Sequence, residues 1–358
     1  MSSVKSKPTG SVSDLISALD AALGANDANA SVTQFIDTGY APLNYAISGR
    51  YDGGLPFGRM VEMFGESSSG KTALATEWMV AAQKMGGVAG FIDWERSFDV
   101  GLAEGFGLNV NRPYWLYNKA ETWESGNTWA AKACRAIRAS KAIPDDAPIL
   151  FVFDSIASAI PMSMLYDSKG AKREIESFTM NDTSALSRVT STTLKVMAQY
   201  CEEYNATFLY LNQIRLKIGV VFGDPRTTPG GKAMEYYATN RLSLGREKIM
   251  QASAGGKEFV GQKINIEVTK SKLTKPFKKC AIRMDFDELG VARFDPTYSL
   301  VELLLEKKKL VSPANGYVTW DGKRLSKRAM AELIDKEGRI GELNAMLEPE
   351  AEDSTLPV

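Results

Sequence analysis

The sequence contains no histidine among its 358 residues. This absence excludes a serine–histidine–aspartate triad, a histidine-ligated metal and a histidine acid or base. Cysteine is scarce: Cys134, Cys201 and Cys280 are scattered and odd in number. They indicate a reducing compartment and argue against a disulfide framework or a clustered metal site. Any chemistry must therefore use carboxylates, lysines, a bound cation or backbone amides.

Long apolar runs and an excess of charge are also missing. No run of about 18 apolar residues could cross a membrane, and the N-terminus lacks the apolar segment of a signal peptide. With 43 basic and 43 acidic residues the formal net charge is zero, so only local clusters could attract nucleic acid. We expect a protein of the cytoplasm without a membrane partner, or of the host cytoplasm if the protein is viral.

What is present, from about residue 58, is an alternation of strand-like and helical segments. Strands are predicted near residues 59–64, 88–93, 113–118, 149–154, 206–213 and 263–270. Helices are predicted near residues 71–85, 122–140 and 184–204. Continuous apolar strands that alternate with helices indicate an α/β fold whose mainly parallel sheet is covered by helices on both faces. Such sheets bind ligands at the carboxyl ends of their strands.

Smaller segments flank this core. Residues 13–23 predict a short amphipathic helix that is marginal unless it packs on something. After about residue 290 the pattern predicts a small α+β unit, and the acidic C-terminus predicts disorder. The expected organisation is an N-terminal helix and linker (1–40), a core (41–290), a small C-terminal domain (291–345) and an acidic tail (346–358).

The strongest local signal is GESSSGKT at residues 65–72. It follows a predicted strand and opens a predicted helix, which is the context of a phosphate-binding P-loop. Successive backbone amides would form an anion cradle at the helix N-terminus. Lys71 would reach the β- and γ-phosphates and the Thr72 hydroxyl would bind Mg²⁺. The nucleotide-binding residues would be Glu66, Ser67, Ser68, Ser69, Gly70, Lys71 and Thr72.

Two further strands end in carboxylates. ILFVFD (149–154) places Asp154 where it could hold Mg²⁺ with Thr72. FIDWER (91–96) offers Glu95 to orient a water beside the γ-phosphate, with Asp93 as the alternative. Without the P-loop, either pattern would equally fit solvated carboxylates at a strand end.

A long connection follows the strand that ends at Gln213. Basic and apolar residues alternate in it with glycines, as in Arg215, Lys217, Ile218, Gly219 and Phe222. Basic groups can bind phosphates, and apolar wedges can stack with bases of a single strand. On sequence alone, a lid or a partner-binding loop remains an alternative.

Together these segments closely resemble the bacterial RecA recombinase family. The shared stretches are GGLPFGRMVEMFGESSSGKT, FIDWER, FVFDS, NQIRLKIGVVFGDPRTTPGGKA and VTKSKLTKPFK, in the family's order. The resemblance covers about residues 41–290 and extends less strongly over 291–345. It implies a RecA-type P-loop ATPase core, with ATP and Mg²⁺ as cofactors. It also implies helical filaments on single-stranded DNA and strand exchange with a homologous duplex.

The resemblance assigns roles to single residues. Glu95 would be the hydrolytic base, and Gln213 a nucleotide sensor joined to the second DNA loop. The first DNA loop would fall within residues 160–183, in a longer form than usual. The DNA-binding residues would be Met180, Arg188, Arg215, Lys217, Ile218, Gly219, Phe222, Thr227, Gly230 and Gly231.

The alternating Lys270 and Lys272 match lysines that reach the ATP of a neighbouring subunit in this family. Asp99 and Phe286 match residues that contact adenine, although Leu102 stands where an aromatic ring usually stacks. Arg96 replaces a usual histidine, Arg226 a usual acidic residue and Glu235 a usual lysine. These departures leave base selectivity and the handling of DNA open.

A basic C-terminal cluster provides a candidate duplex-binding surface, with a solvated basic face as the alternative. It comprises Lys307, Lys308, Lys309, Lys323, Arg324, Lys327 and Arg328, beside Tyr317 and Trp320. Two other functions compete with a recombinase: a DNA-binding scaffold that hydrolyses ATP poorly, and a ring-shaped helicase on the same core fold.

Overall fold

The computed structural model describes residues 31–179, 182, 184–216, 226–253, 256–287, 290–314 and 316–347, and residues 12, 13, 17, 18 and 21. The chain divides into two units, residues 1–33 and 34–358. In the first, residues 12, 13, 17, 18 and 21 are helical, and the rest of the predicted helix at 13–23 lies outside the described residues. The acidic residues 348–358 also lie outside the described part.

Six parallel strands form the centre of the second unit. Their order across the sheet is β10-β3-β7-β6-β4-β5. The bounds are β3 Met60–Gly65, β4 Val88–Asp93, β5 Trp115–Asn118, β6 Ile149–Asp154, β7 Ala206–Gln213 and β10 Asn240–Ser253. All residues of β3, β4 and β6 are buried, which explains why these strands read as continuous apolar runs.

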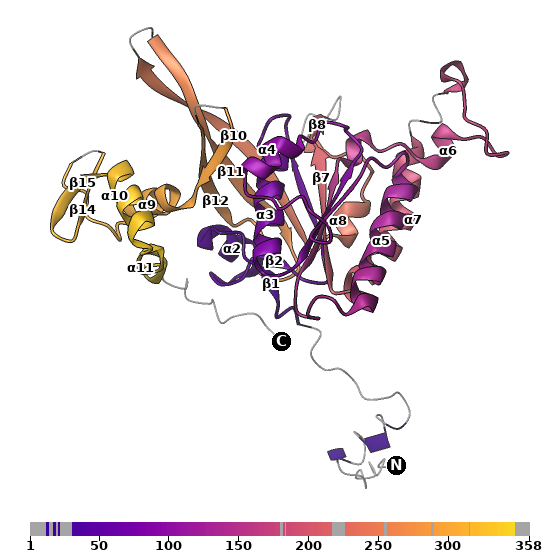
Figure 1. Cartoon of the computed structure of the whole chain (residues 1–358), viewed down its shortest axis with the longest axis horizontal. Helices are drawn as coiled ribbons and strands as arrows, with labels where there is room; N and C mark the ends of the chain where they lie inside the picture. The colour runs from indigo at the N-terminus through magenta and orange to yellow at the C-terminus, as the bar shows by residue number, and fades with distance from the viewer. Residues whose placement is uncertain are drawn as a thin grey trace, which may run out of the picture. The chain divides into compact units, whose positions relative to one another are not determined.

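An antiparallel extension continues the sheet beyond β10. It consists of β11 Gly256–Ser271, β12 Lys279–Phe286 and β13 Ala292–Asp295. Strands β10 and β11 form a long hairpin whose tip stands clear of the rest of the fold (Figure 1). Nine strands thus form one sheet among the described residues.

Helices cover both faces of the sheet, as predicted. Helix α3 (Lys71–Lys84) contributes Trp78 and Met79 to one buried cluster, which also includes α2 (Ala41–Ser48). Helices α5 (Trp123–Ser140) and α7 (Ala185–Glu203) contribute Trp123 and Leu194 to a second cluster. Figure 1 shows α5 and α7 together on their side of the sheet. The expected α/β fold with a RecA-type core is therefore confirmed.

Short elements complete this unit. They are β1 Phe35–Ile36, β2 Leu55–Pro56, α4 Val100–Gly105, α6 Met162–Leu165, β8 Arg215–Leu216, β9 Arg226–Thr227 and α8 Ala233–Tyr237. Single turns of 3-10 helix lie at Ile156–Ser158 and Ile175–Ser177. The N-terminus of α5 has a reciprocal cap between Thr122 and Ser125, which satisfies two otherwise unpaired amides.

The C-terminal segment is α+β, as the pattern predicted. It contains α9 Pro296–Glu306, β14 Tyr317–Trp320, β15 Lys323–Ser326, α10 Lys327–Glu337 and α11 Ile340–Ala345. Because β13 pairs with β12 as far as Asp295, the core sheet runs a few residues past 290. The domain division itself stays a prediction. No helix in the described part of the chain is long and apolar enough to cross a membrane.

Candidate nucleotide and DNA site

The P-loop lies between β3 and α3, at the carboxyl end of the central strands. Gly70 caps α3 with φ +86°, a conformation that a residue with a side chain rarely adopts. A Cβ there would also lie 3.1 Å from the Ile264 side chain. The glycine therefore lets the loop turn into the helix, at whose N-terminus the helix dipole favours an anion.

Two side chains of the loop fit a phosphate ligand. The Lys71 Nζ donates to the carbonyl oxygens of Glu66, at 2.8 Å, and Gly65, at 3.2 Å. Burial lowers the pKa of Lys71, so a phosphate would supply the counter-charge that this ammonium needs. The Ser69 hydroxyl is buried with no hydrogen-bond partner among the described residues. A buried polar atom without a partner is costly, and a phosphate oxygen would satisfy it.

Thr72 and Asp154 meet across the site. The Thr72 hydroxyl donates to Asp154 Oδ2 at 2.9 Å. Burial, and then the charge of Glu95, raise the pKa of Asp154 to about 7. A nearby cation would favour the charged form of this buried carboxylate and so offset the effect of burial. One hydroxyl, one carboxylate and nucleotide phosphates form a usual Mg²⁺ site, so the residues present fit this ion.

Glu95 lies beside this pair and contacts Gln213, the last residue of β7. Strands β4 and β6 run side by side, so their ends bring Asp93 opposite Asp154. The Glu95 Oε1 accepts hydrogen bonds from Ser155 Oγ at 2.5 Å and from Gln213 Nε2 at 3.0 Å. Glu95 is exposed, as a group that meets a water must be.

Asp93, the alternative to Glu95, has a different environment. It is 1% exposed. Its carboxylate accepts hydrogen bonds from the amides of Arg96, Ser97 and Phe98 and from the Tyr117 hydroxyl. A carboxylate with four donors builds the turn after β4 and is poorly placed to orient water. The geometry therefore favours Glu95 for this task.

The predicted adenine contacts lie on two segments that the structure brings together. Asp99 caps α4 by accepting from the Leu102 amide at 2.9 Å. Val291, just before β13, lies against Gly105 of α4, and Arg293 donates to the Gly105 carbonyl. Phe286 is partly exposed and packs on Phe259 with ring centroids 5.5 Å apart. Leu102 is also exposed, so an aliphatic and an aromatic side chain are available for a base.

Lys270 and Lys272 form a pair, as their alternation predicted. Both ammonium groups donate to the Tyr236 carbonyl, Lys270 at 3.1 Å and Lys272 at 3.0 Å, and Lys270 also donates to the Glu235 carbonyl. These carbonyls end α8, where the helix dipole favours cations. Burial, followed by repulsion from Lys272, lowers the pKa of Lys270 to about 8.

A short ladder closes the predicted second DNA loop. Arg215 pairs with Thr227 and Leu216 with Arg226. Arg215 is exposed and Thr227 half-buried. Lys217, Ile218, Gly219 and Phe222, between the two strands, lie outside the described residues.

Gly230 and Gly231 serve the packing of this loop on α7. Both have positive φ, and a Cβ on Gly230 would lie 2.9 Å from Ile156. The Thr190 hydroxyl donates to the Gly230 carbonyl at 2.7 Å. The conformation of these glycines is therefore explained without DNA, and their predicted DNA contacts stay predictions.

The described part of the predicted first DNA loop is held by one arginine. Arg173 holds it together through an ion pair with Asp182 at 2.9 Å and bonds to the Ser163 and Ser177 carbonyls. Met180 lies outside the described residues. Arg188 is exposed on α7, where it donates to Ser184 Oγ.

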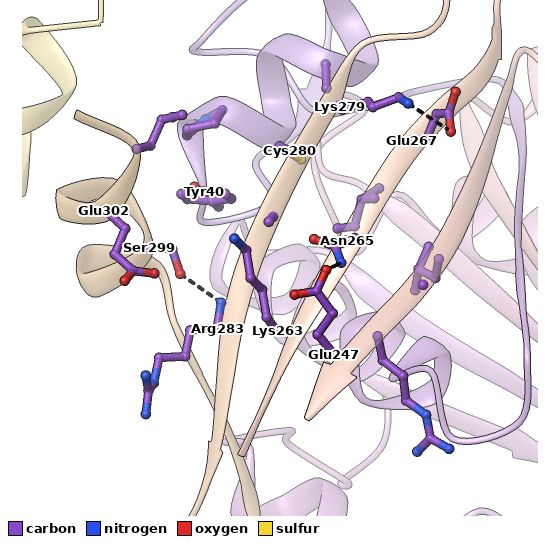
Figure 2. Close-up of a pocket in the computed structure, with 18 of the residues that line it drawn as sticks. Tyr40, Glu247, Lys263, Asn265, Glu267, Lys279, Cys280, Arg283, Ser299 and Glu302 are labelled. Atoms are coloured by element: carbon purple, nitrogen blue, oxygen red, sulfur yellow. Dashed lines mark hydrogen bonds and ion pairs between the residues drawn. The ribbon is translucent and has the colours of Figure 1, made fainter. Parts of the chain in front are cut away.

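A groove of about 1370 Å³ crosses the antiparallel extension (Figure 2). Figure 2 shows Glu247, Lys263 and Asn265 on neighbouring strands and Glu302 on α9 facing it. The groove shares Glu66 and Ser69 with the P-loop, but Lys71, Thr72, Glu95 and Asp154 do not line it. It is therefore a feature beside the nucleotide site rather than the site itself.

The basic C-terminal cluster is only partly free for DNA. Lys327 pairs with Glu302 at 3.0 Å, and Arg328 pairs with Asp285 at 2.9 Å and with Asp295. Trp320 is 7% exposed. Lys323, Arg324 and Tyr317 remain exposed on the β14–β15 hairpin, where Arg324 lies over the Tyr317 ring.

Sequence reasoning missed residues that support the site. Ser155 and Ser158 bond to Glu95, and Tyr117 bonds to Asp93. Ser155 directly follows Asp154, and that position was the only signal that could have found it. Tyr117 comes from a different strand, and no spacing in the sequence predicts its contact.

Comparison with known proteins agrees with this geometry. The family model for the RecA N-terminal domain matches residues 20–291. The chain is 32% identical to Protein RecA of Leptospira meyeri over 320 residues, which cover 86% of this chain and 75% of that protein. The chain therefore belongs to the RecA family, whose members act in DNA recombination and repair.

Proposed function

We propose that this protein is an ATP- and Mg²⁺-dependent recombinase that forms helical filaments on single-stranded DNA. It would pair that strand with a homologous duplex and hydrolyse ATP when DNA is bound, in the cytoplasm of the cell where it acts. Bound ATP would supply the phosphoanhydride that is cleaved. The P-loop amides and Lys71 would hold its phosphates, and Thr72 and Asp154 would hold Mg²⁺.

One observation carries this proposal: the hydrogen bond between Gln213 Nε2 and Glu95 Oε1. Glu95 is the residue best placed to orient the attacking water. Gln213 ends β7, and two residues later the chain enters the DNA loop at Arg215. A displacement of this loop can therefore reach the carboxylate through one side chain, which is the short connection that DNA-stimulated hydrolysis requires.

The sheet register supports a role for the lysine pair in a neighbouring subunit's site. On β10, Leu244 lies opposite Gly65 on one side and opposite Ile266 on the other. Lys270 follows Ile266 by four residues, about 13 Å along the strand. The P-loop is also two strands away, about 9–10 Å. The lysines are thus remote from their own subunit's phosphates, and a head-to-tail contact that supplies them would build a filament.

Replacement of Gln213 tests the proposal. In the parent, single-stranded DNA should raise the rate of ATP hydrolysis, and Gln213→Ala should bind nucleotide but lose most of this stimulation. Gln83→Ala is a matched control, because it removes another hydrogen-bonded glutamine amide, one that donates to the carbonyls of Asn109 and Tyr114 rather than to Glu95. A Gln213→Ala protein stimulated as strongly as the parent would contradict the sensor role.

Electron microscopy with ATP and single-stranded DNA separates the two competing functions. Helical filaments support the recombinase, and closed rings would indicate a helicase. A filament without measurable hydrolysis would indicate a scaffold instead.

A further inference from the structure

A fully buried carboxylate lies just below the P-loop and takes no part in the site described above. Glu62 is on β3, three residues before Gly65, and is 0% exposed. Its Oε2 accepts from Arg241 Nε at 2.5 Å, and Arg241 is itself only 13% exposed. A buried charge is tolerated only when it is paired and hydrogen-bonded, so this pair is a fixed feature of the core.

The pair binds both ends of the second DNA loop. Asn212 Nδ2 donates to Glu62 Oε1 at 2.9 Å and to the Pro229 carbonyl at 3.0 Å. Arg241 Nη2 donates to the Thr228 hydroxyl at 3.2 Å. Asn212 lies just before the loop, and Thr228 and Pro229 follow its end. Glu62 is therefore linked to the segment before the loop through Asn212 and to the segment after it through Arg241.

The same group of residues reaches the sensor and the region of the lysine pair. The Asn212 Oδ1 accepts from the Gln213 amide at 2.9 Å, so the orientation of the Asn212 side chain helps to place Gln213. Arg241 lies 3.8 Å from Glu235 in α8, whose last carbonyls Lys270 and Lys272 hold. Arg241 also covers the Phe64 ring at 4.9 Å, next to the first residue of the P-loop.

We propose that the Glu62–Arg241 pair positions Gln213 according to the state of the DNA loop, so that it carries the coupling between DNA binding and ATP hydrolysis. This inference rests on the proposed function and adds two positioning residues to it. When bound DNA displaces residues 228 and 229, their hydrogen bonds to Arg241 and Asn212 must either break or move these two partners. Because a buried Glu62 without its partner would be costly, the displacement passes to Asn212 and Gln213.

The test compares hydrolysis with and without oligo(dT) in the full-length protein. Glu62→Gln keeps the shape and the acceptor for Asn212 but loses the charge that binds Arg241. We expect basal hydrolysis within about threefold of the parent, and a stimulation factor that falls about tenfold or more, as the loss of a charge-assisted hydrogen bond implies. The effect of ATP on the affinity for oligo(dT) should also shrink, since the same contacts would couple the two binding sites.

A second pair of variants covers the case in which Glu62→Gln does not fold. Thr228→Val removes the hydroxyl that accepts from Arg241 while keeping the shape, and Thr228→Ser keeps the hydroxyl. We expect stimulation to fall about threefold or more in the first and to stay near the parent's in the second. Equal losses in both would overturn the inference.

A matched control comes from the other end of β7. Arg138 donates to the carbonyls of Tyr204 and Asn205, just before that strand begins. Arg138→Gln should lower the unfolding midpoint and leave the stimulation factor unchanged. If Glu62 were only structural, Glu62→Gln would likewise lower the unfolding midpoint and leave the stimulation factor unchanged.

The outcomes separate the two proposals. If oligo(dT) does not stimulate the parent, the proposed function fails and this inference fails with it. If the parent is stimulated, and Glu62→Gln and Thr228→Val are stimulated equally, only the inference is overturned.

Discussion

The parallel and antiparallel halves of the sheet carry different kinds of functional group. In the parallel half, β3, β4, β6 and β7 all end at one edge. The P-loop, Glu95, Asp154 and Gln213 therefore converge within one chain. In the antiparallel half, strand ends alternate between edges, and Lys270 and Lys272 lie beside α8, away from the P-loop. The parallel half can assemble a site by itself, whereas the antiparallel half supplies charges that another subunit's phosphates could use.

The largest expected effect is that of removing the lysine pair, which tests this division directly. Lys270→Ala with Lys272→Ala should lower ATP hydrolysis on single-stranded DNA by about 10³-fold or more, by analogy with cationic fingers. Binding of ATP to the isolated subunit should change little, because the P-loop is remote from both lysines. Steady-state phosphate release and a fluorescent nucleotide titration measure the two effects.

Mixing this variant with Glu95→Gln sharpens the comparison. Some interfaces then join intact lysines of one subunit to an intact Glu95 of the next, so the mixture should hydrolyse more ATP than either protein alone. No recovery in filaments shown to contain both subunits would mean that the lysines act within their own subunit or not at all.

A smaller effect is expected from replacing single carboxylates in the parallel half. Glu95→Gln should lower hydrolysis by about 10²–10⁴-fold, the usual contribution of a general base, with little change in stability because Glu95 is exposed. Asp93→Asn should instead lower the free energy of unfolding by about 1–3 kcal/mol, since a buried acceptor of four hydrogen bonds is altered. Urea unfolding and phosphate release distinguish the two. A larger loss of activity in the Asp93 variant would reverse the assignment.

The smallest effect concerns pH and belongs to the antiparallel half. Because the pKa of Lys270 is lowered to about 8, this side chain loses its charge in the free subunit above that pH. A neighbouring γ-phosphate needs the ammonium form, so ATP-dependent assembly should weaken from pH 8 to 9, by up to about tenfold per unit for one proton taken up. Lys270→Arg keeps its charge and should flatten this dependence, as light scattering would measure.

The weaker assembly above pH 8 cannot be explained by unfolding that results from deprotonation of Lys270. A free lysine holds its proton up to about pH 10.4, so between pH 8 and that value the unfolded chain binds more protons than the folded chain. The contribution of this group to the free energy of unfolding therefore rises with pH in that window. An equal weakening in Lys270→Arg would show that another group controls assembly.

The local sequence was sufficient to predict those parts of the site that are built from residues close together in the chain. The P-loop needs a strand, a glycine-rich turn and a helix within about 20 residues, and GESSSGKT between β3 and α3 provides them. The buried strands β4, β6 and β7 were predictable because parallel strands covered on both faces are apolar throughout. The site carboxylates at the ends of β4 and β6 were predictable because such ends meet at one edge.

Contacts between distant segments could not be predicted in this way. Glu62 meets Arg241 because β3 and β10 are neighbours, although 179 positions separate the two residues. The turn that gives Asp93 four hydrogen-bond donors could not be predicted either. The sequence favoured Glu95 through the family resemblance, and the hydrogen bonds of Asp93 give the physical reason for that preference.

The sequence by itself determined the α/β fold, the P-loop and the family, because each depends on residue types in a short, ordered stretch. The tertiary structure alone decided which groups touch. It joins Gln213 to Glu95, links both ends of the proposed DNA loop through Glu62 and Arg241, and sets Lys270 two strands away from its own P-loop. The physical reason is that hydrogen bonds and ion pairs act over a few ångströms, whereas the residues that make them here are separated by up to 179 positions along the chain.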